Sequence, residues 1–232
     1  MSDTPTPPPA PDPPAADGPP ERSGPPTWLM LLLLAGVVLP AIGIFIADAV
    51  IDVEPAEDAL PPMFAMPDFA LTDTTGNTFT DEDLAGQRTV VEFVFTQCQL
   101  FCPVMSERMS RLQQALDADP SMADVRLISI SVDPDNDTPQ VLAAYAAAYG
   151  RNPDRWELLT GEDRAQVWSL VESGFLLPVS DEPQNPAMPI GHSSKWLIFD
   201  SAGFARTTVN AIQGETVEET LAALRYIGPP RN

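Results

Sequence analysis

Apolar and polar positions divide the chain into two unequal parts. Residues 28–47 form a run of 20 residues without a charged side chain, whereas from residue 67 onward short apolar runs alternate with stretches of helical spacing. A helix rises about 1.5 Å per residue, so a run of this length spans a hydrocarbon core of about 30 Å. We therefore predict one N-terminal transmembrane helix over 28–47 and an extramembrane domain over 67–232.

The extramembrane part contains apolar, β-branched runs typical of strands and three- and four-residue apolar spacings typical of helices. Strands are expected at 69–71, 77–79, 89–95, 125–132, 196–199 and 204–209. Helices are expected at 103–118, 138–149, 162–172 and from Thr216, where Glu219 would complete a capping box. Residues 174–190 carry four prolines and are expected to form a long loop. This order predicts an α/β domain with a mixed sheet flanked by helices.

The segments on either side of the apolar run have a different composition. Residues 1–27 contain 11 prolines, and residues 48–66 contain several prolines and alanines. The first segment cannot bury enough apolar surface to offset the entropy lost on ordering. We predict a disordered tail over 1–27 and a linker over 48–66 that holds the domain away from the membrane.

Charge around the apolar run indicates its orientation. Arg22 is the only basic residue before the run, and the C-terminal flank is acidic. Because basic residues stay on the cytoplasmic side, the N-terminus is expected in the cytoplasm and the domain in the periplasm, as a single-pass inner-membrane protein. A cleaved signal peptide is the alternative, since Ala47-Asp48-Ala49 resembles a cleavage site. However, the apolar run is too long for one and the preceding tail is acidic.

The net charge of the chain is −21, and it contains one lysine. Nucleic acids and anionic membrane surfaces repel such a protein. We therefore expect no nucleic-acid partner and membrane contact only through residues 28–47.

Cys98 and Cys102 are the only cysteines, and they lie where an expected strand ends and an expected helix begins. Amides at a helix start favour thiolate. Side chains four apart on a helical turn have Cβ atoms roughly 5–6 Å apart, close enough to hold one metal ion or to form a disulfide. A purely structural disulfide is disfavoured, because closing so short a loop removes little entropy from the unfolded chain.

Several short segments occur in an order that resembles the thioredoxin-like Sco/SenC/PrrC family of copper-binding assembly proteins. The segments are Pro67-Asp68-Phe69, Phe95-Thr96, Cys98-x-x-x-Cys102-Pro103, Ser131-Val132-Asp133-Pro134, Asp137-Thr138-Pro139, Leu159-Thr160-Gly161 and His192-Ser193. The resemblance covers residues 67–228 and implies a thioredoxin-like fold. His192 is the only histidine in the chain.

The resemblance implies that Cys98, Cys102 and His192 ligate copper, with one Cu(I) or Cu(II) ion per domain. It further implies that the protein helps to assemble the dinuclear copper centre of cytochrome c oxidase. The implied partners are the copper-site subunit of the oxidase, an upstream copper donor and a thiol reductant. Two thiolates and an imidazole are a soft ligand set that suits Cu(I) and tolerates Cu(II), whereas structural zinc prefers four protein ligands.

Two positions depart from the usual family pattern. Gln99 stands where the family usually has proline, and Gly191 stands where it usually has aspartate. The first change lets the cysteine segment flex more, and the second removes a carboxylate next to the histidine. Neither change removes a ligand.

Three functions remain open at this point. The first is a membrane-anchored metallochaperone, which binds and transfers copper without enzymatic turnover. The second is an extracytoplasmic thiol-disulfide oxidoreductase with Cys98 and Cys102 as the redox-active pair. The third is a redox or copper sensor.

Overall fold

The computed structural model describes residues 26–29, 32 and 60–228. Most of the predicted tail over 1–27, of the predicted transmembrane helix over 28–47 and of the predicted linker over 48–66 therefore lies outside the described residues. Among the described residues, no helix is both long enough and apolar enough to cross a membrane. The chain divides into two units at residue 54, and the unit from Pro55 to Asn232 contains the folded domain.

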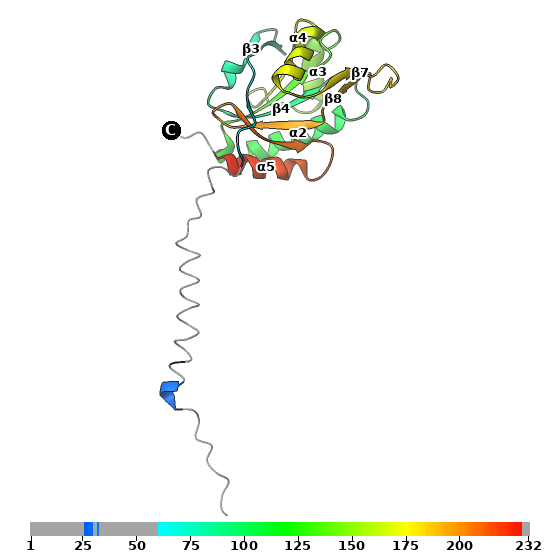
Figure 1. Ribbon diagram of the computed structural model, residues 1–232. Helices are drawn as coiled ribbons and strands as arrows, with labels where there is room; N and C mark the ends of the chain where they lie inside the picture. Colours follow the sequence, from blue (N-terminus) through cyan, green and yellow to red (C-terminus); the bar gives the residue numbers. More distant parts are fainter. Residues whose placement is uncertain (1–25, 30–31, 33–59, 229–232) are drawn as a thin grey trace, which may run out of the picture. The chain divides into compact units, whose positions relative to one another are not determined.

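One large mixed sheet and one small sheet form the framework of the domain (Figure 1). The strands are β1 (Phe64–Ala65), β2 (Ala70–Asp73), β3 (Thr78–Thr80), β4 (Arg88–Val94), β5 (Val125–Ser131), β6 (Trp156–Thr160), β7 (Val179–Asp181), β8 (Ile190–His192), β9 (Lys195–Phe199) and β10 (Phe204–Asn210). The large sheet has the order β1-β10-β9-β4-β5-β6-β2-β3, and β7 pairs with β8 in a separate sheet.

The central strands β4, β5 and β6 are parallel, and β9 runs antiparallel to β4. Every residue of β4 is buried, as expected for a strand covered on both faces. The predicted α/β domain with a mixed sheet flanked by helices is therefore confirmed.

Helices cover both faces of the large sheet. They are α2 (Cys102–Asp117), α3 (Pro139–Ala148), α4 (Arg164–Ser169) and α5 (Thr216–Ile227), together with the short 3-10 helices η1 (Asp81–Leu84) and η2 (Pro120–Met122) and the π-helix η3 (Leu170–Gly174). Buried side chains of α2, α3 and α5 pack in one core on one face. Those of α4 and η3 pack in a second core on the other face, which also contains Cys98 and Cys102.

Helix α3 begins as its sequence predicts. The Thr138 side chain accepts a hydrogen bond from the Val141 amide, and Pro139 occupies the first turn. The capping box predicted for the last helix is wrong. Thr216 is already helical, its hydroxyl donates to the Asn210 carbonyl at 2.8 Å, and the N-cap position belongs to Glu215.

Four strands were missed by the sequence prediction. Strand β6 is short, and Glu157 interrupts its apolar run; the structure buries this carboxylate by pairing it with Arg151. Strands β7 and β8 lie in the predicted loop over 174–190 and just beyond it, so that loop is corrected to a hairpin. Strand β1 lies in the predicted linker and pairs with β10, so the end of that linker belongs to the sheet.

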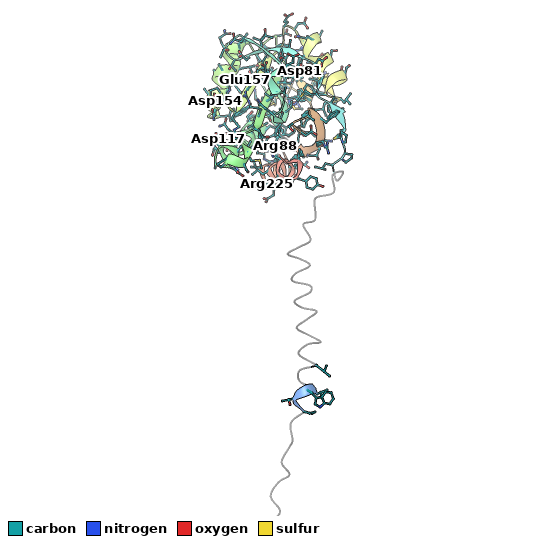
Figure 2. All side chains as sticks on the ribbon, turned by 90° about the vertical axis from the view of Figure 1, so that its left-hand side faces the viewer. Asp81, Arg88, Asp117, Asp154, Glu157 and Arg225 are labelled. Atoms are coloured by element: carbon teal, nitrogen blue, oxygen red, sulfur yellow. The ribbon has the colours of Figure 1, made fainter. Side chains whose placement is uncertain are left out.

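At the start of β4, a buried arginine joins the sheet to the surrounding chain (Figure 2). The Arg88 side chain is 1% exposed and makes two hydrogen bonds to the Asp124 carboxylate, at 2.6 and 2.7 Å. It also donates to the carbonyls of Leu224 in α5 and Ser121 in η2. These bonds fix the end of the sheet opposite to the cysteines.

Candidate metal centre

The two cysteines lie at the carboxyl end of β4. Residues 95–101, here called the cysteine loop, connect β4 to α2; Cys98 lies within this loop and Cys102 is the first residue of α2. Their side chains are 5% and 0% exposed, and both are free thiols. The predicted position at a strand–helix junction is confirmed.

A buried carboxylate holds the start of the cysteine loop. The Thr96 amide donates to Asp137 at 3.1 Å, and the hydroxyls of Thr96 and Ser131 donate to the same carboxylate. Burial raises the pKa of Asp137 even though these bonds oppose the shift. Asp137 thus ties the loop before Cys98 to the segment that follows β5.

The two thiols are strongly unequal. A hydrogen bond with Cys102 is the main factor that lowers the pKa of Cys98, and the amides of Leu100, Phe101 and Cys102 also donate to its sulfur. The same bond, together with burial, raises the pKa of Cys102. Cys98 is therefore the residue that ionises first, and Cys102 keeps the shared proton.

His192 approaches the pair from the other side. Its Nε2 lies 3.3 Å from Cys102 Sγ, and its Nδ1 lies 3.0 Å from the Ser193 carbonyl oxygen. A carbonyl only accepts, so Nδ1 carries the proton and the Nε2 lone pair faces the sulfur. The ring also contacts the edge of Phe95, with centroids 5.7 Å apart. Burial lowers the pKa of His192, which keeps the imidazole neutral.

A small hairpin carries the histidine. The His hairpin, residues 179–192, consists of β7, β8 and their connection, with Val179 paired to His192. We expected His192 to follow a loop, but it is the last residue of β8. The Gln99 amide of the cysteine loop donates to the Ala187 carbonyl of the hairpin at 2.9 Å.

The two cysteines and the histidine contact one another two at a time, and the three side chains do not converge on one point. In the described ranges of the chain, no three His, Cys, Asp or Glu side chains are grouped so that they could hold a metal ion as they stand. The hydrogen-bonded pairs are Cys98 with Cys102 and Cys102 with His192. Two thiols and one neutral imidazole nevertheless have the chemistry that soft Cu(I) requires.

A second buried acid was missed by the sequence prediction. Glu92 is 0% exposed in the middle of β4; it accepts hydrogen bonds from Ser129 and the Trp196 indole, each at 2.7 Å. Burial raises its pKa to about 7, and its charge contributes to the raised pKa of Cys102. The signal was one acidic residue inside an otherwise apolar strand. Asp137 gave no comparable signal, because its partner Thr96 is 41 residues away in sequence.

The glycine before the histidine lies in a crowded place. A Cβ atom on Gly191 would lie 2.9 Å from Ser180 Oγ and 3.1 Å from both Cγ and Oε1 of Glu182. The carboxylate of Glu182 therefore occupies the space beside Gly191. An acidic group remains close to position 191, although it comes from the opposite strand of the hairpin.

These features define a class of protein. A thioredoxin-like α/β domain presents two free thiols at a strand–helix junction, and a hairpin brings an imidazole to one of them. Such a site can bind a soft metal ion or exchange disulfides.

A family model described as SCO1/SenC matches residues 57–227. The chain belongs to this family, and the predicted resemblance is confirmed. The SCO1 protein homolog of Bacillus subtilis (strain 168) is 33% identical over 138 residues, which are 60% of this chain and 70% of that protein.

Solved structures agree with this assignment. BsSco, described as a member of the Sco family of cytochrome c oxidase assembly proteins with a disulfide switch, is 27% identical. Its TM-score is 0.64, and the match covers 72% of this chain and 95% of that chain. The structure of Bradyrhizobium japonicum ScoI with copper bound is 28% identical, with a TM-score of 0.58, and the match covers 70% of this chain and 98% of that chain.

Proposed function

We propose that this chain is a copper metallochaperone that binds one copper ion through Cys98, Cys102 and His192. The observation that carries the proposal is the 3.3 Å contact between Cys102 Sγ and His192 Nε2, two residues 90 positions apart. The Nε2 lone pair, which is able to ligate copper, faces one of the two sulfurs that would share the ion. Copper bound to a family relative supports the choice of metal.

The inequality of the thiols suits metal loading. Cys98 offers a thiolate stabilised by amides at the helix start, so it is the first ligand that an incoming ion meets. Cys102 has to release its proton when it becomes a ligand, and the neutral His192 can ligate without losing one. The low exposure of both sulfurs excludes water, which protects Cu(I) from oxidation.

The recipient of the copper is, in this proposal, the copper-site subunit of cytochrome c oxidase. An upstream donor supplies the ion and a thiol reductant keeps the cysteines reduced. The assembly role stated for BsSco supports this recipient. The uncharged run over 28–47 anchors the chain in the inner membrane with the domain in the periplasm. This topology is supported by Arg22 before the run and by the lack of basic residues after it until Arg88.

The test compares copper binding by full-length wild type and His192→Ala in the reduced state. We expect the variant to lose most Cu(II) binding, while two thiolates retain part of the Cu(I) binding. Ser193→Ala is the matched control, because it keeps the carbonyl that orients the imidazole. Unchanged Cu(II) spectra in a folded His192→Ala protein would remove His192 from the site.

A thiol-disulfide oxidoreductase is the second candidate, and the lowered pKa of Cys98 favours it. In that reaction the Cys98 thiolate attacks a target disulfide and forms a mixed disulfide. Cys102 then loses its proton and attacks Cys98 Sγ, which releases the target as a dithiol and leaves a disulfide on this chain. Reductase activity that survives in His192→Ala would support this candidate, and a redox or copper sensor would use the same residues.

A further inference from the structure

The His hairpin is held to the domain differently from the other strands. Strands β7 and β8 form their own two-stranded sheet and share no ladder with the large sheet. Val179 and Ile190 anchor the hairpin in the core through buried side chains. The Arg164–Asp181 ion pair ties β7 to α4. His192 is joined to β9 through Ser193 and Ser194, but no backbone ladder pairs the hairpin with the large sheet.

Two hydrogen-bond contacts connect the hairpin with the cysteines among the described residues. One is the Cys102–His192 contact itself, and the other is the bond from the Gln99 amide to the Ala187 carbonyl. The second bond uses only backbone atoms and does not involve a metal ligand. It can therefore hold the hairpin in place whether or not a metal is bound.

The amides of the cysteine loop are divided between two acceptors. The N–H groups of Leu100, Phe101 and Cys102 donate to the Cys98 sulfur, whereas the N–H of Gln99 points the other way, to Ala187. A single turn therefore stabilises the thiolate and binds the histidine-bearing segment. A proline at position 99, which the family resemblance leads one to expect, has no N–H and could not make this bond.

We propose that the peptide N–H of Gln99 is a positioning group that holds His192 against Cys102. Gln99 touches neither copper nor substrate in this role; it acts through the His hairpin. The inference rests on the proposed function, since it concerns how the third ligand is presented. The positioning role also gives a physical reason why position 99 of this chain carries a residue with a peptide N–H and not a proline.

The test compares Gln99→Pro with Gln99→Ala in the full-length, metal-free, reduced protein. The alanine variant keeps the N–H and removes only an exposed side chain, so it is the matched control. Diethyl pyrocarbonate acylates the neutral Nε2 of histidine, and His192 is the only histidine in the chain. The rate of its modification, read by mass spectrometry, therefore reports how often His192 leaves Cys102.

We expect Gln99→Pro to raise the modification rate about three- to tenfold, the effect of losing one ordinary hydrogen bond, while Gln99→Ala matches wild type. Equal rates in both variants would overturn the inference, and so would a rise in the alanine variant. If Gln99→Pro fails to fold, hydrogen exchange in wild type decides the question. The Gln99 amide is expected to exchange at least about threefold more slowly than an unprotected amide, and an unprotected rate would overturn the inference.

Copper binding separates this inference from the proposed function. Gln99→Pro should weaken Cu(II) binding by about three- to tenfold, with a smaller effect on Cu(I), which the two thiolates dominate. If the modification rates behave as expected but His192→Ala leaves Cu(II) binding unchanged, the positioning role stands and the ligand assignment fails. If Gln99→Pro leaves the modification rate unchanged while His192→Ala abolishes Cu(II) binding, the ligand assignment stands and the positioning role fails.

Discussion

The two ends of β4 differ in how their polar side chains are bound. At its amino end, Arg88 is fully enclosed and makes four hydrogen bonds to Asp124, Leu224 and Ser121. At its carboxyl end lie two free thiols and an imidazole that meet through single contacts. One end uses its polar groups to hold the fold, and the other leaves them available for chemistry.

The two ends therefore differ in how firmly their polar groups are held. A guanidinium bound bidentately to a carboxylate and also to two carbonyls has no remaining freedom. The thiol pair shares one proton, and its histidine comes from a separate small sheet. We therefore expect that replacing a proton by a metal ion at this end leaves the strands of the large sheet in place.

The largest effect is expected from removing a thiol. Cys98→Ser and Cys102→Ser should each weaken Cu(I) binding by about 2.5–4 kcal/mol, since four ligands of a structural zinc site together contribute roughly 10–16 kcal/mol. Thermal unfolding of the metal-free variants should remain close to wild type. Competition with a Cu(I) chelator measures the first quantity, and retained affinity in either variant would contradict the two-thiolate site.

The next largest effect concerns the other end of β4. Arg88→Met leaves the Asp124 carboxylate without its partner and should lower the free energy of unfolding by about 3 kcal/mol. Denaturant unfolding measures this loss, with Arg225→Met as an exposed control on α5. The folded fraction of Arg88→Met should still bind copper with wild-type affinity; a parallel loss of copper affinity would show that the two ends are coupled.

The third prediction uses pH to examine the middle of β4. The pKa of Glu92 is raised to about 7, so the folded state binds its proton more tightly than the unfolded state does. Its contribution to stability is present below about pH 4.5 and is lost as pH rises through about 7. Glu92→Gln removes this dependence, so the stability of the variant relative to wild type should increase by about 2 kcal/mol between pH 5 and pH 8.

Thermal unfolding across that pH range measures the Glu92 effect. The control is Glu107→Gln, which removes a surface carboxylate on α2. A constant difference between Glu92→Gln and wild type at all pH values would show that folding does not shift the pKa of Glu92.

The smallest effect is expected at the His hairpin. Gly191→Asp and Gly191→Ala both place a Cβ against Ser180 and Glu182, and these side chains can move, so each should cost about 1 kcal/mol. Only the aspartate adds a charge beside Glu182, so it should destabilise the hairpin more than the alanine does. Hydrogen exchange of residues 179–192 measures both, and tighter protection in Gly191→Asp would contradict this packing.

Many of the helices and strands around the candidate site could be predicted from the sequence. The apolar run that forms β4, the helical spacing after Pro103 and the Thr138 cap are local signals, and each predicted its element correctly. Strand β6 was missed because a glutamate in a short apolar run indicates an exposed position. In the fold, an ion pair with Arg151 allows Glu157 to be buried. The hairpin strands β7 and β8 were missed because they are defined by their backbone pairing with each other. Their proline-rich sequence has no alternation of apolar and polar residues that would predict strands.

The sequence by itself determined the fold class, the strand–helix junction that holds both cysteines and, through its motifs, the family. These depend on periodicity, turn residues and spacing over a few positions, which the chain carries locally. Only the tertiary structure decided the inequality of the thiols, the Asp137–Thr96 bond, the buried state of Glu92 and the approach of His192 to Cys102. Each of these features depends on groups that lie between about 40 and 100 positions apart in sequence, or on the loss of water around a buried group. A local sequence pattern shows neither the long-range contact nor the burial.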